Sequence, residues 1–201
     1  LLYKENGFKK KETAMELKEI LSANPPLEAV VEKIEKKKEN KNPPLLFNLA
    51  ELQNECSRLF KLSPDETLKI VQELYEKKLV TYPRTDARVL SSAVAKEIYK
   101  NISGLKNYEH GSVYATEILE TGAYKNLIKT RYVNDKQITD HYAIIPTGQG
   151  LSALRSLSMQ GSKVYEVIVR RFLSIFYPPA VYQKVSITTK IKEESFFSSF
   201  K

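Results

Sequence analysis

Apolar and polar residues alternate near the C-terminal end of the chain. Between Val181 and Ile191, apolar side chains recur at odd-numbered positions, and most of the residues between them are polar. A period of two is typical of a β-strand with one buried face. The apolar positions within residues 27–36 predict a second strand, so strands are expected near both ends of the chain.

The residues between these two strands have the period of α-helices, because their apolar side chains recur three and four positions apart. A further helix is expected before the first strand. The predicted helices span residues 11–22, 48–61, 63–78, 91–102, 151–160 and 162–176. Ser152 is the expected cap of the helix at 151–160, and a short strand is expected from Leu79 to Tyr82.

The apolar stripes of these helices predict the core. Cys56 lies on one of them, so we expect a buried and inert thiol. The predicted core positions are Leu49, Leu52, Cys56, Leu59 and Phe60 in one helix, Leu68, Val71 and Tyr75 with Ile70 and Leu74 in the next, and Val164, Ile168, Phe172 and Ile175 in the last.

A tight turn joins the helices at 48–61 and 63–78. Ser63 is placed to cap the second helix, Pro64 suits its first turn, and Glu66 completes a capping box. Two helices joined in this way resemble a helix-turn-helix. Since the turn lacks glycine, two packed helices without a DNA contact are an equal alternative.

Two Pro-Pro pairs, Pro43-Pro44 and Pro178-Pro179, divide the chain. They predict domain boundaries at residues 1–42, 43–178 and 179–201. If the two strand-bearing ends share one sheet, the segment between them is a lobe on a two-stranded neck that is able to swing as a body. The charged run Glu35–Asn42 is then either a solvated edge or an arm that contacts phosphates.

Composition narrows the classes of function. The chain has 32 lysines and arginines against 24 acidic residues, a net charge of +8, which favours a polyanionic partner. A single cysteine excludes an internal disulfide and indicates a reducing compartment. No apolar run is long enough to cross a membrane. The sequence begins without methionine, so we expect a piece of a longer protein.

The strongest candidate for chemistry is Tyr82, in the stretch Thr81-Tyr82-Pro83-Arg84-Thr85-Asp86. A phenol has a pKa of about 10 and attacks phosphorus only when a cation stabilises the phenolate and the developing phosphate charge. Arg84 is near enough in sequence to provide that cation. His141 is a second candidate, for contact with a phosphate or transfer of a proton. A structural tyrosine and a structural loop histidine are the alternatives at this stage.

Three stretches together resemble the type IA DNA topoisomerases, and their forms are closest to the topoisomerase III-like branch. They are 43–53, which begins Pro-Pro-Leu-Leu-Phe-Asn-Leu, 72–86, which ends Thr-Tyr-Pro-Arg-Thr-Asp, and His141-Tyr142-Ala143-Ile144-Ile145-Pro146-Thr147. The resemblance covers most of residues 40–192.

This resemblance implies a mainly α, α+β chain. Residues 43–178 would be a tyrosine-bearing helical domain of the catabolite-activator type with a helix-turn-helix, and the two flanks would be strands of a β-rich arch domain. Tyr82 would cut one DNA strand and stay bonded to its 5′ phosphate, and the reaction would need no ATP. Arg84 would hold the scissile phosphate, and His141 would lie beside them. Gln72, Thr85 and Arg88 would contact single-stranded DNA.

The resemblance also implies partners and a cofactor. We expect Mg²⁺ in the full-length enzyme, bound by an acidic domain that has no counterpart in this chain, and no nucleotide, because no phosphate-binding glycine loop is present. The isolated chain is expected to be inactive, monomeric and cytoplasmic, in association with the nucleoid. Tyr142 and Ala87 differ from the residues that are common at these positions in the family, so the resemblance does not define the detailed arrangement around His141.

Two other functions are compatible with these patterns. The first is a non-enzymatic DNA-binding module built on the helix-turn-helix. The second is another tyrosine transesterase, such as a recombinase, but the several spaced arginines and histidines expected there are absent from this sequence.

Overall fold

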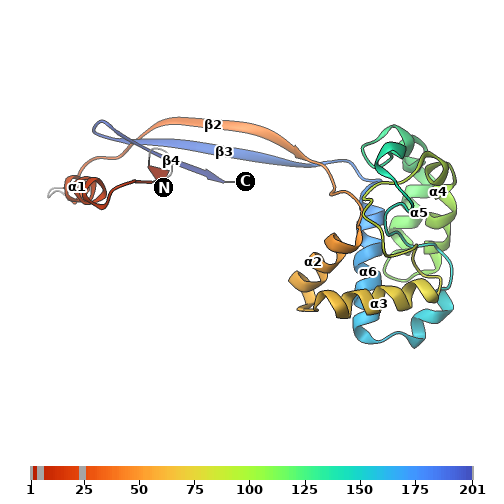
Figure 1. Cartoon of the computed structure of the whole chain (residues 1–201). Helices are drawn as coiled ribbons and strands as arrows, with labels where there is room; N and C mark the ends of the chain where they lie inside the picture. Colours follow the sequence, from red (N-terminus) through yellow and green to blue (C-terminus); the bar gives the residue numbers. More distant parts are fainter. Residues whose placement is uncertain (1, 4–6, 23–25, 201) are drawn as a thin grey trace. The chain divides into compact units, whose positions relative to one another are not determined.

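The fold is described from a computed structural model that covers residues 2–3, 7–22 and 26–200. The chain divides into two compact units (Figure 1). One comprises Leu1–Asn42 and Pro179–Lys201, and the other comprises Pro43–Pro178. Both divisions fall at the Pro-Pro pairs, where the missing N–H groups and the restricted backbone of proline end regular structure.

The first unit is an antiparallel sheet with one helix, α1 (Lys11–Leu21). Its strand order is β1-β4-β3-β2. The strands are β1 (Leu2–Tyr3), β2 (Val30–Lys41), β3 (Ala180–Ile191) and β4 (Glu194–Phe200). β2 pairs with β3 from Val30–Lys190 to Lys41–Ala180, so the two ends of the chain share one sheet, as the neck hypothesis requires (Figure 1).

Burial in this sheet follows the number of neighbouring strands. β2 is exposed along its whole length, so the charged run lies on a solvated strand. β3 is exposed at residues 180–183 and half-buried at 184–191. The second part pairs with β4 as well as β2, which covers it on both edges. The prediction of a half-buried strand from Val181 to Ile191 is therefore right for residues 184–191 and wrong for residues 181–183.

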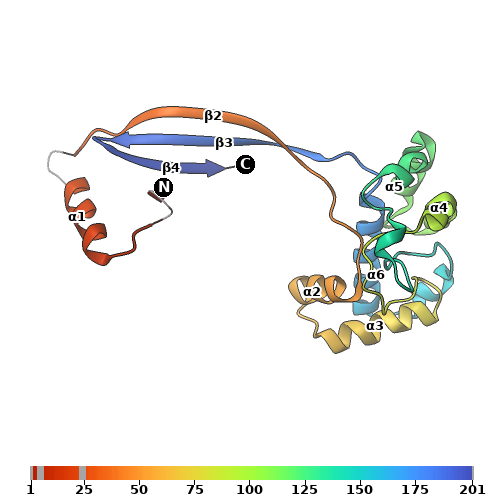
Figure 2. The ribbon, with the colours of Figure 1, turned by 45° about the horizontal axis from the view of Figure 1, so that its top comes forward.

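The second unit is helical, as predicted. α2 and α3 pack together and α3 packs on α6, while α4 packs on α5 (Figure 2). Its α-helices are α2 (Leu49–Phe60), α3 (Pro64–Glu76), α4 (Ser92–Gly104), α5 (Ser112–Thr121) and α6 (Met159–Ser174). Its short 3₁₀ helices are η2 (Leu105–Asn107), η3 (Ala123–Lys129), η4 (Asp135–Gln137) and η5 (Leu151–Ser156).

Local capping chemistry places the start of α3. The Ser63 hydroxyl accepts a hydrogen bond from the N–H of Glu66 at 3.2 Å, and the Glu66 carboxylate accepts one from the N–H of Ser63 at 2.7 Å. With Pro64 at the first position, the predicted capping box is confirmed. These hydrogen bonds lower the pKa of Glu66 below its usual value. They also hold the turn between α2 and α3 in one shape.

The helix stripes predict most of the core and fail at two positions. All four predicted positions of α6 are buried, as are Leu52 and Cys56 in α2. Leu59 is 42% exposed and Tyr75 is 38% exposed, so both predictions are wrong. Each lies at the margin of its stripe, where the helix turns its side chain away from the neighbouring helix. Tyr75 instead contacts Tyr82.

Two further predictions differ from the structure. Residues 79–82 form no strand, but an isolated bridge between Val80 and Pro146. The helix at 151–160 is a 3₁₀ turn that ends at Ser156, and it follows Gly150 in the left-handed region rather than a cap by Ser152. Ser158 caps α6, which therefore begins earlier than predicted, at Met159. This region offers several candidate caps (Ser152, Ser156, Ser158 and Ser162), and the period alone does not choose between them.

Cys56 is expected to resist alkylation in the folded protein. Its side chain is fully buried, and burial raises the pKa of the thiol to about 11. At pH 8 roughly one thiol in a thousand is ionised at such a pKa, and only the thiolate reacts. In buffer we expect iodoacetamide to leave the thiol unmodified for about an hour. In about 6 M guanidinium, which unfolds even stable domains, we expect complete modification, and intact mass measures both outcomes. Rapid labelling in buffer would contradict this prediction.

Candidate active site

Tyr82 and His141 line one cavity of about 540 Å³ in the helical unit. The cavity opens to solvent beside the C-terminal end of α3, which contributes Tyr75 and Glu76 to its wall. Its other lining residues are Lys78, Val80, Thr81, Tyr142, Thr147 and Gln149. The structure therefore brings together two of the residues that the sequence singles out for catalysis.

The ring of Tyr82 lies between two other rings. Its centroid is 4.4 Å from that of His141, with the planes tilted by 44°. On another side Tyr75 approaches edge-on, at 5.4 Å and 80°. Contacts of this geometry are favourable for aromatic rings and restrict how the tyrosine turns. The phenol is thus held half-buried beside an imidazole that is exposed to solvent.

Hydrogen bonds clip the segment before Tyr82 to the segment after His141. The N–H of Thr81 donates to the carbonyl of Ile145 at 3.0 Å, and the N–H of Thr147 donates to that of Leu79 at 3.0 Å. The Thr81 hydroxyl donates to the Ala143 carbonyl at 3.0 Å and accepts from the N–H of Ile145 at 3.0 Å. Tyr82 therefore follows directly on a segment with little freedom to move.

A second set of bonds holds His141 from the other side. The Thr85 hydroxyl donates to the His141 carbonyl at 2.8 Å and accepts from the N–H of Ala87 at 3.1 Å. The N–H of Ala143 donates to the Val89 carbonyl at 3.0 Å. Since Thr85 comes three residues after Tyr82, one short loop positions both rings.

Replacing Thr85 with valine is expected to displace His141 while leaving the helices intact. The change keeps the shape of the side chain but leaves a buried carbonyl and a buried N–H without their partner, which costs about 1–3 kcal/mol. We expect a lower free energy of unfolding by that amount, measured by urea denaturation of the chain. Thr85→Ser, which keeps the hydroxyl, is the matched control; equal loss in both variants would refute a role of the hydrogen bond.

The loop that follows Tyr82 is anchored on the start of α2. The N–H of Leu49 donates to the Thr85 carbonyl at 3.2 Å, and the side-chain amide of Asn48 donates to the Asp86 carbonyl at 3.1 Å. Arg88 donates to the Leu46 carbonyl at 3.2 Å and pairs with Glu51 at 3.3 Å. Through these contacts residues 45–51 hold the loop that follows Tyr82. This gives a structural reason why the family resemblance includes this stretch as well as the tyrosine.

None of the other predicted site residues lines the cavity. Arg84 is exposed, and its guanidinium has no ion pair or hydrogen bond with the part of the chain that the structure describes. The side-chain amide of Gln72, on α3, donates a hydrogen bond at 3.3 Å to Glu76, and Glu76 lines the cavity. Arg88 and Thr85 are engaged within the chain, as described above. Contact of these four residues with DNA stays a prediction.

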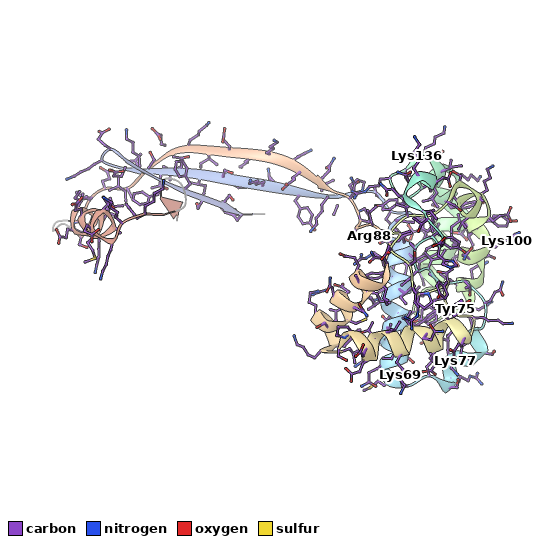
Figure 3. The ribbon with its side chains drawn as sticks, viewed as in Figure 1. Lys69, Tyr75, Lys77, Arg88, Lys100 and Lys136 are labelled. Carbon is purple, nitrogen blue, oxygen red and sulfur yellow. The ribbon has the colours of Figure 1, made fainter. Side chains whose placement is uncertain are left out.

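Several residues of the cavity carry no signal in the sequence. The helix stripe predicts Tyr75 in the core, and Lys78 is expected only at the end of a helix. Lys78 lines the cavity and is exposed, with φ at +60°, so it adds a cation close to Tyr82. Basic residues also lie on the neighbouring helices. Lys69 lies on α3, as does Tyr75, Lys77 lies at the end of α3, and Lys100 lies on α4 (Figure 3). Only the backbone path after α3 reveals which lysine faces the cavity.

Glycines allow the segment after His141 to pack closely on α4. The carbonyl of Gly148 lies against Gly104, the last residue of α4, with no room for a side chain between them. Gly148 itself has φ at +76°, which favours glycine. The side-chain amide of Asn101 donates to the Pro146 carbonyl at 3.0 Å and fixes the same segment.

The described residues contain no group of three or more histidine, cysteine, aspartate or glutamate side chains that could hold a metal ion. Burial raises the pKa of the Tyr142 phenol, which therefore stays protonated beside the cavity. Within the same described ranges, none of the helices is both long and apolar enough to cross a membrane. The chemistry available here is that of a phenol, an imidazole and the ammonium group of Lys78 at an open cavity.

Comparison with known proteins places the chain in one family. The family model described as DNA topoisomerase matches residues 2–201. The chain is 38% identical over 172 residues to DNA topoisomerase 3 of Bacillus subtilis, and 37% identical over 169 residues to that of Bacillus licheniformis. In each case the match covers 84% of this chain and 23% of the relative. The chain therefore spans about a quarter of the length of these relatives.

A solved structure agrees with these sequence matches. Full-length topoisomerase I from Thermotoga maritima matches with a TM-score of 0.61 and 26% sequence identity. The match covers 98% of this chain and 30% of that one.

Proposed function

The chain belongs to the DNA topoisomerase family, on its topoisomerase III-like branch, and from this premise we propose that it carries the nucleophile of a type IA enzyme. Such an enzyme breaks one DNA strand, lets another strand pass, and rejoins the break without ATP. The observation that carries the proposal is the placement of Tyr82 on the wall of an open cavity, with the His141 ring 4.4 Å away.

The proposed step is a transesterification. The Tyr82 oxygen attacks the phosphorus of a phosphodiester as the phenol gives up its proton. The bond from phosphorus to the 3′ oxygen breaks, and that oxygen takes up a proton as it leaves. The 5′ phosphate stays on Tyr82 as a phosphotyrosine ester. Attack by the 3′ hydroxyl reverses every step, so the energy of the broken bond is kept and no nucleotide is consumed.

The neighbouring groups have roles that follow from their charge and position. Arg84 is exposed two residues after Tyr82 and is free to bind the scissile phosphate through its planar fork. Lys78 adds a second cation at the cavity. Positive groups near a phenol stabilise the phenolate and the charge that develops on phosphate. His141 is placed to contact the same phosphate or to transfer the proton.

Other properties concern the parent protein. The resemblance implies a bound Mg²⁺ held by acidic residues outside this chain, where it would help to bind and orient the phosphates. We therefore propose that the 201-residue chain binds single-stranded DNA weakly as a monomer and does not relax supercoiled DNA. The proposed location is the cytoplasm, with the nucleoid.

A direct test is to identify the residue that becomes attached to DNA. The parent protein is incubated with a single-stranded oligonucleotide that has one cleavage site, denatured and digested with a protease. Mass spectrometry is expected to find the DNA on the peptide that contains Tyr82, through a 5′ phosphate. Attachment to another tyrosine, or through a 3′ phosphate, would refute the proposal.

The second candidate function is a non-enzymatic module that reads duplex DNA with α2 and α3. It is favoured by the turn between these helices, which the capping box of Ser63 and Glu66 holds in one shape. This function predicts a preference for a duplex of particular sequence. The topoisomerase function predicts a preference for single strands and an affinity that falls with salt. Competition between the two forms of DNA therefore separates them.

A further inference from the structure

A second cavity, of about 700 Å³, lies in the helical unit apart from Tyr82. It is formed by the loop after η2, the 3₁₀ turn η5 and one face of α6. Its lining includes Tyr108 and His110 from the loop, Arg155 from η5, and Tyr165 from α6. None of these residues takes part in the chemistry proposed above.

The hydroxyl of Tyr165 stands out among the buried polar groups of the described residues. The side chain is fully buried, and its oxygen makes no hydrogen bond with the residues that the structure describes. Burial raises the pKa of this phenol, so the hydroxyl keeps its proton and offers a donor as well as an acceptor. A buried polar group without a partner is costly, and it is rare in folded proteins unless a ligand or water completes it. Tyr165 is one of the residues that line the cavity, and because its hydroxyl has almost no accessible surface, a ligand there completes it when neighbouring side chains shift.

The walls around this hydroxyl are aromatic. The ring of Tyr108 meets that of Tyr165 edge-on, with centroids 5.1 Å apart and planes at 76°. His110 lies 5.7 Å from Tyr108 on its exposed side. Aromatic faces of this kind receive flat rings, and every nucleobase has such a face.

The charges at the cavity nearly balance. Glu166 is already paired with Arg170 at 2.8 Å. The remaining charged residues, Glu109 and Arg155, are exposed and of opposite sign. Such a lining disfavours a bare phosphate or an ammonium group inside the cavity. It suits a neutral, flat ligand with hydrogen-bonding edges, with Arg155 at the rim for an attached phosphate.

The two cavities are neighbours along the chain. Gln149 lines the first and Leu151 lines the second, and two residues span at most about 7.6 Å between their Cα atoms. Gly148 and Gly150 flank Gln149, so the segment between the cavities carries few side chains. At this segment the linings of the two cavities come within two residues of each other along the chain.

We propose that the second cavity binds one base of the same single-stranded DNA that reaches Tyr82. The Tyr165 hydroxyl hydrogen-bonds the edge of the base, Tyr108 and His110 contact its face, and Arg155 contacts a phosphate of the strand. This inference rests on the proposed function, since it takes DNA as the ligand, and it assigns residues to which that function gives no role.

The test compares variants of the 201-residue chain in binding to a fluorescein-labelled oligothymidylate of twelve residues, followed by fluorescence anisotropy. Thymine offers two carbonyl acceptors to a phenol. Tyr165→Phe removes only the hydroxyl, and we expect affinity to fall about three- to tenfold, the effect of one lost hydrogen bond. Tyr124→Phe changes a tyrosine that lines neither cavity and is expected to bind as the wild type does.

A second pair of variants tests the phosphate contact. Arg155→Ala is expected to weaken binding and to reduce the slope of log affinity against log salt by about 0.7, the effect of one phosphate contact on a single strand. Arg131→Ala, an exposed arginine that lines neither cavity, is the matched control. Oligothymidylate that contains 4-thiothymidine is expected to crosslink to Tyr108 or His110, which gives a readout independent of the folding of any variant.

Unchanged affinity in both Tyr165→Phe and Arg155→Ala, or crosslinks that avoid this cavity, would overturn the inference and leave water as the partner of the hydroxyl. A wild-type chain that does not bind the oligonucleotide would overturn it as well. None of these results bears on the role of Tyr82 as nucleophile, because the attachment of DNA to Tyr82 is measured in the parent protein; a wild-type chain that does not bind would also contradict the weak binding proposed for the chain.

Discussion

Replacing Tyr82 with phenylalanine in the parent protein is expected to reduce DNA cleavage and relaxation by roughly 10⁴-fold or more, because the attacking atom is removed. The change leaves the ring and therefore its contacts with Tyr75 and His141. Affinity for single-stranded DNA is expected to fall by about tenfold at most, since the lost hydroxyl supplies at most one hydrogen bond to the substrate.

Two measurements make this prediction sharp. Relaxation of supercoiled plasmid reports the whole cycle, and denaturing gels report the covalent adduct of protein and oligonucleotide. Tyr99→Phe is the matched control, because Tyr99 is an exposed tyrosine of α4 that does not line the cavity. Adducts that persist in the Tyr82 variant at the wild-type level would show that another residue is the nucleophile.

Replacing Gly104 with alanine is expected to destabilise the helical unit by about 3 kcal/mol or more, which is among the larger effects of a single substitution. The added Cβ would overlap the carbonyl oxygen of Gly148 and lie 2.5 Å from its Cα. Both obstacles are backbone, so neither yields by a rotation of a side chain. The segment that carries His141 would have to move away from α4, and DNA cleavage by the parent protein is expected to fall with it.

Gly122 provides a matched control for this variant. It has φ at +68°, but a Cβ there meets only the flexible side chain of Lys125, at 3.2 Å. Gly122→Ala is expected to cost only about 1 kcal/mol, the cost of a left-handed backbone for a residue with a Cβ. Both variants are measured by urea denaturation of the chain. Equal losses in the two would show that close packing of Gly104 on Gly148 is unimportant.

Reading the sequence worked best where structure depends on neighbouring residues. The capping box at Ser63 and Glu66, the buried face of α6 and the breaks at the Pro-Pro pairs are all found as predicted, because caps, periodicity and proline act over a few residues. The errors lie where several local solutions compete. The serines near 151–160 offered more than one cap, and Tyr75 lay at the edge of a stripe.

The candidate site was identified in the sequence only in part. Tyr82, Arg84 and His141 stand out because they lie in stretches that resemble a known family. Their residue types alone left structural roles open. Lys78 and Tyr75 carry no comparable signal: Tyr75 lies in the last turn of α3, which lines the cavity, and Lys78 reaches it through the turn of the backbone after α3. Tyr165 was not singled out at all, since a tyrosine in a helix stripe looks like any other core residue.

The sequence by itself determined most of the α-helices but not α5, together with the capping box of α3, the strands at both ends, the division at the Pro-Pro pairs and the family. Only the tertiary structure decided that His141 meets Tyr82 and that a hydroxyl 56 residues away from it in sequence, on Thr85, holds it there. The physical reason is that periodicity reports which face of an element is buried, and not which residue covers it. The contacts that join distant loops depend on how the whole unit packs.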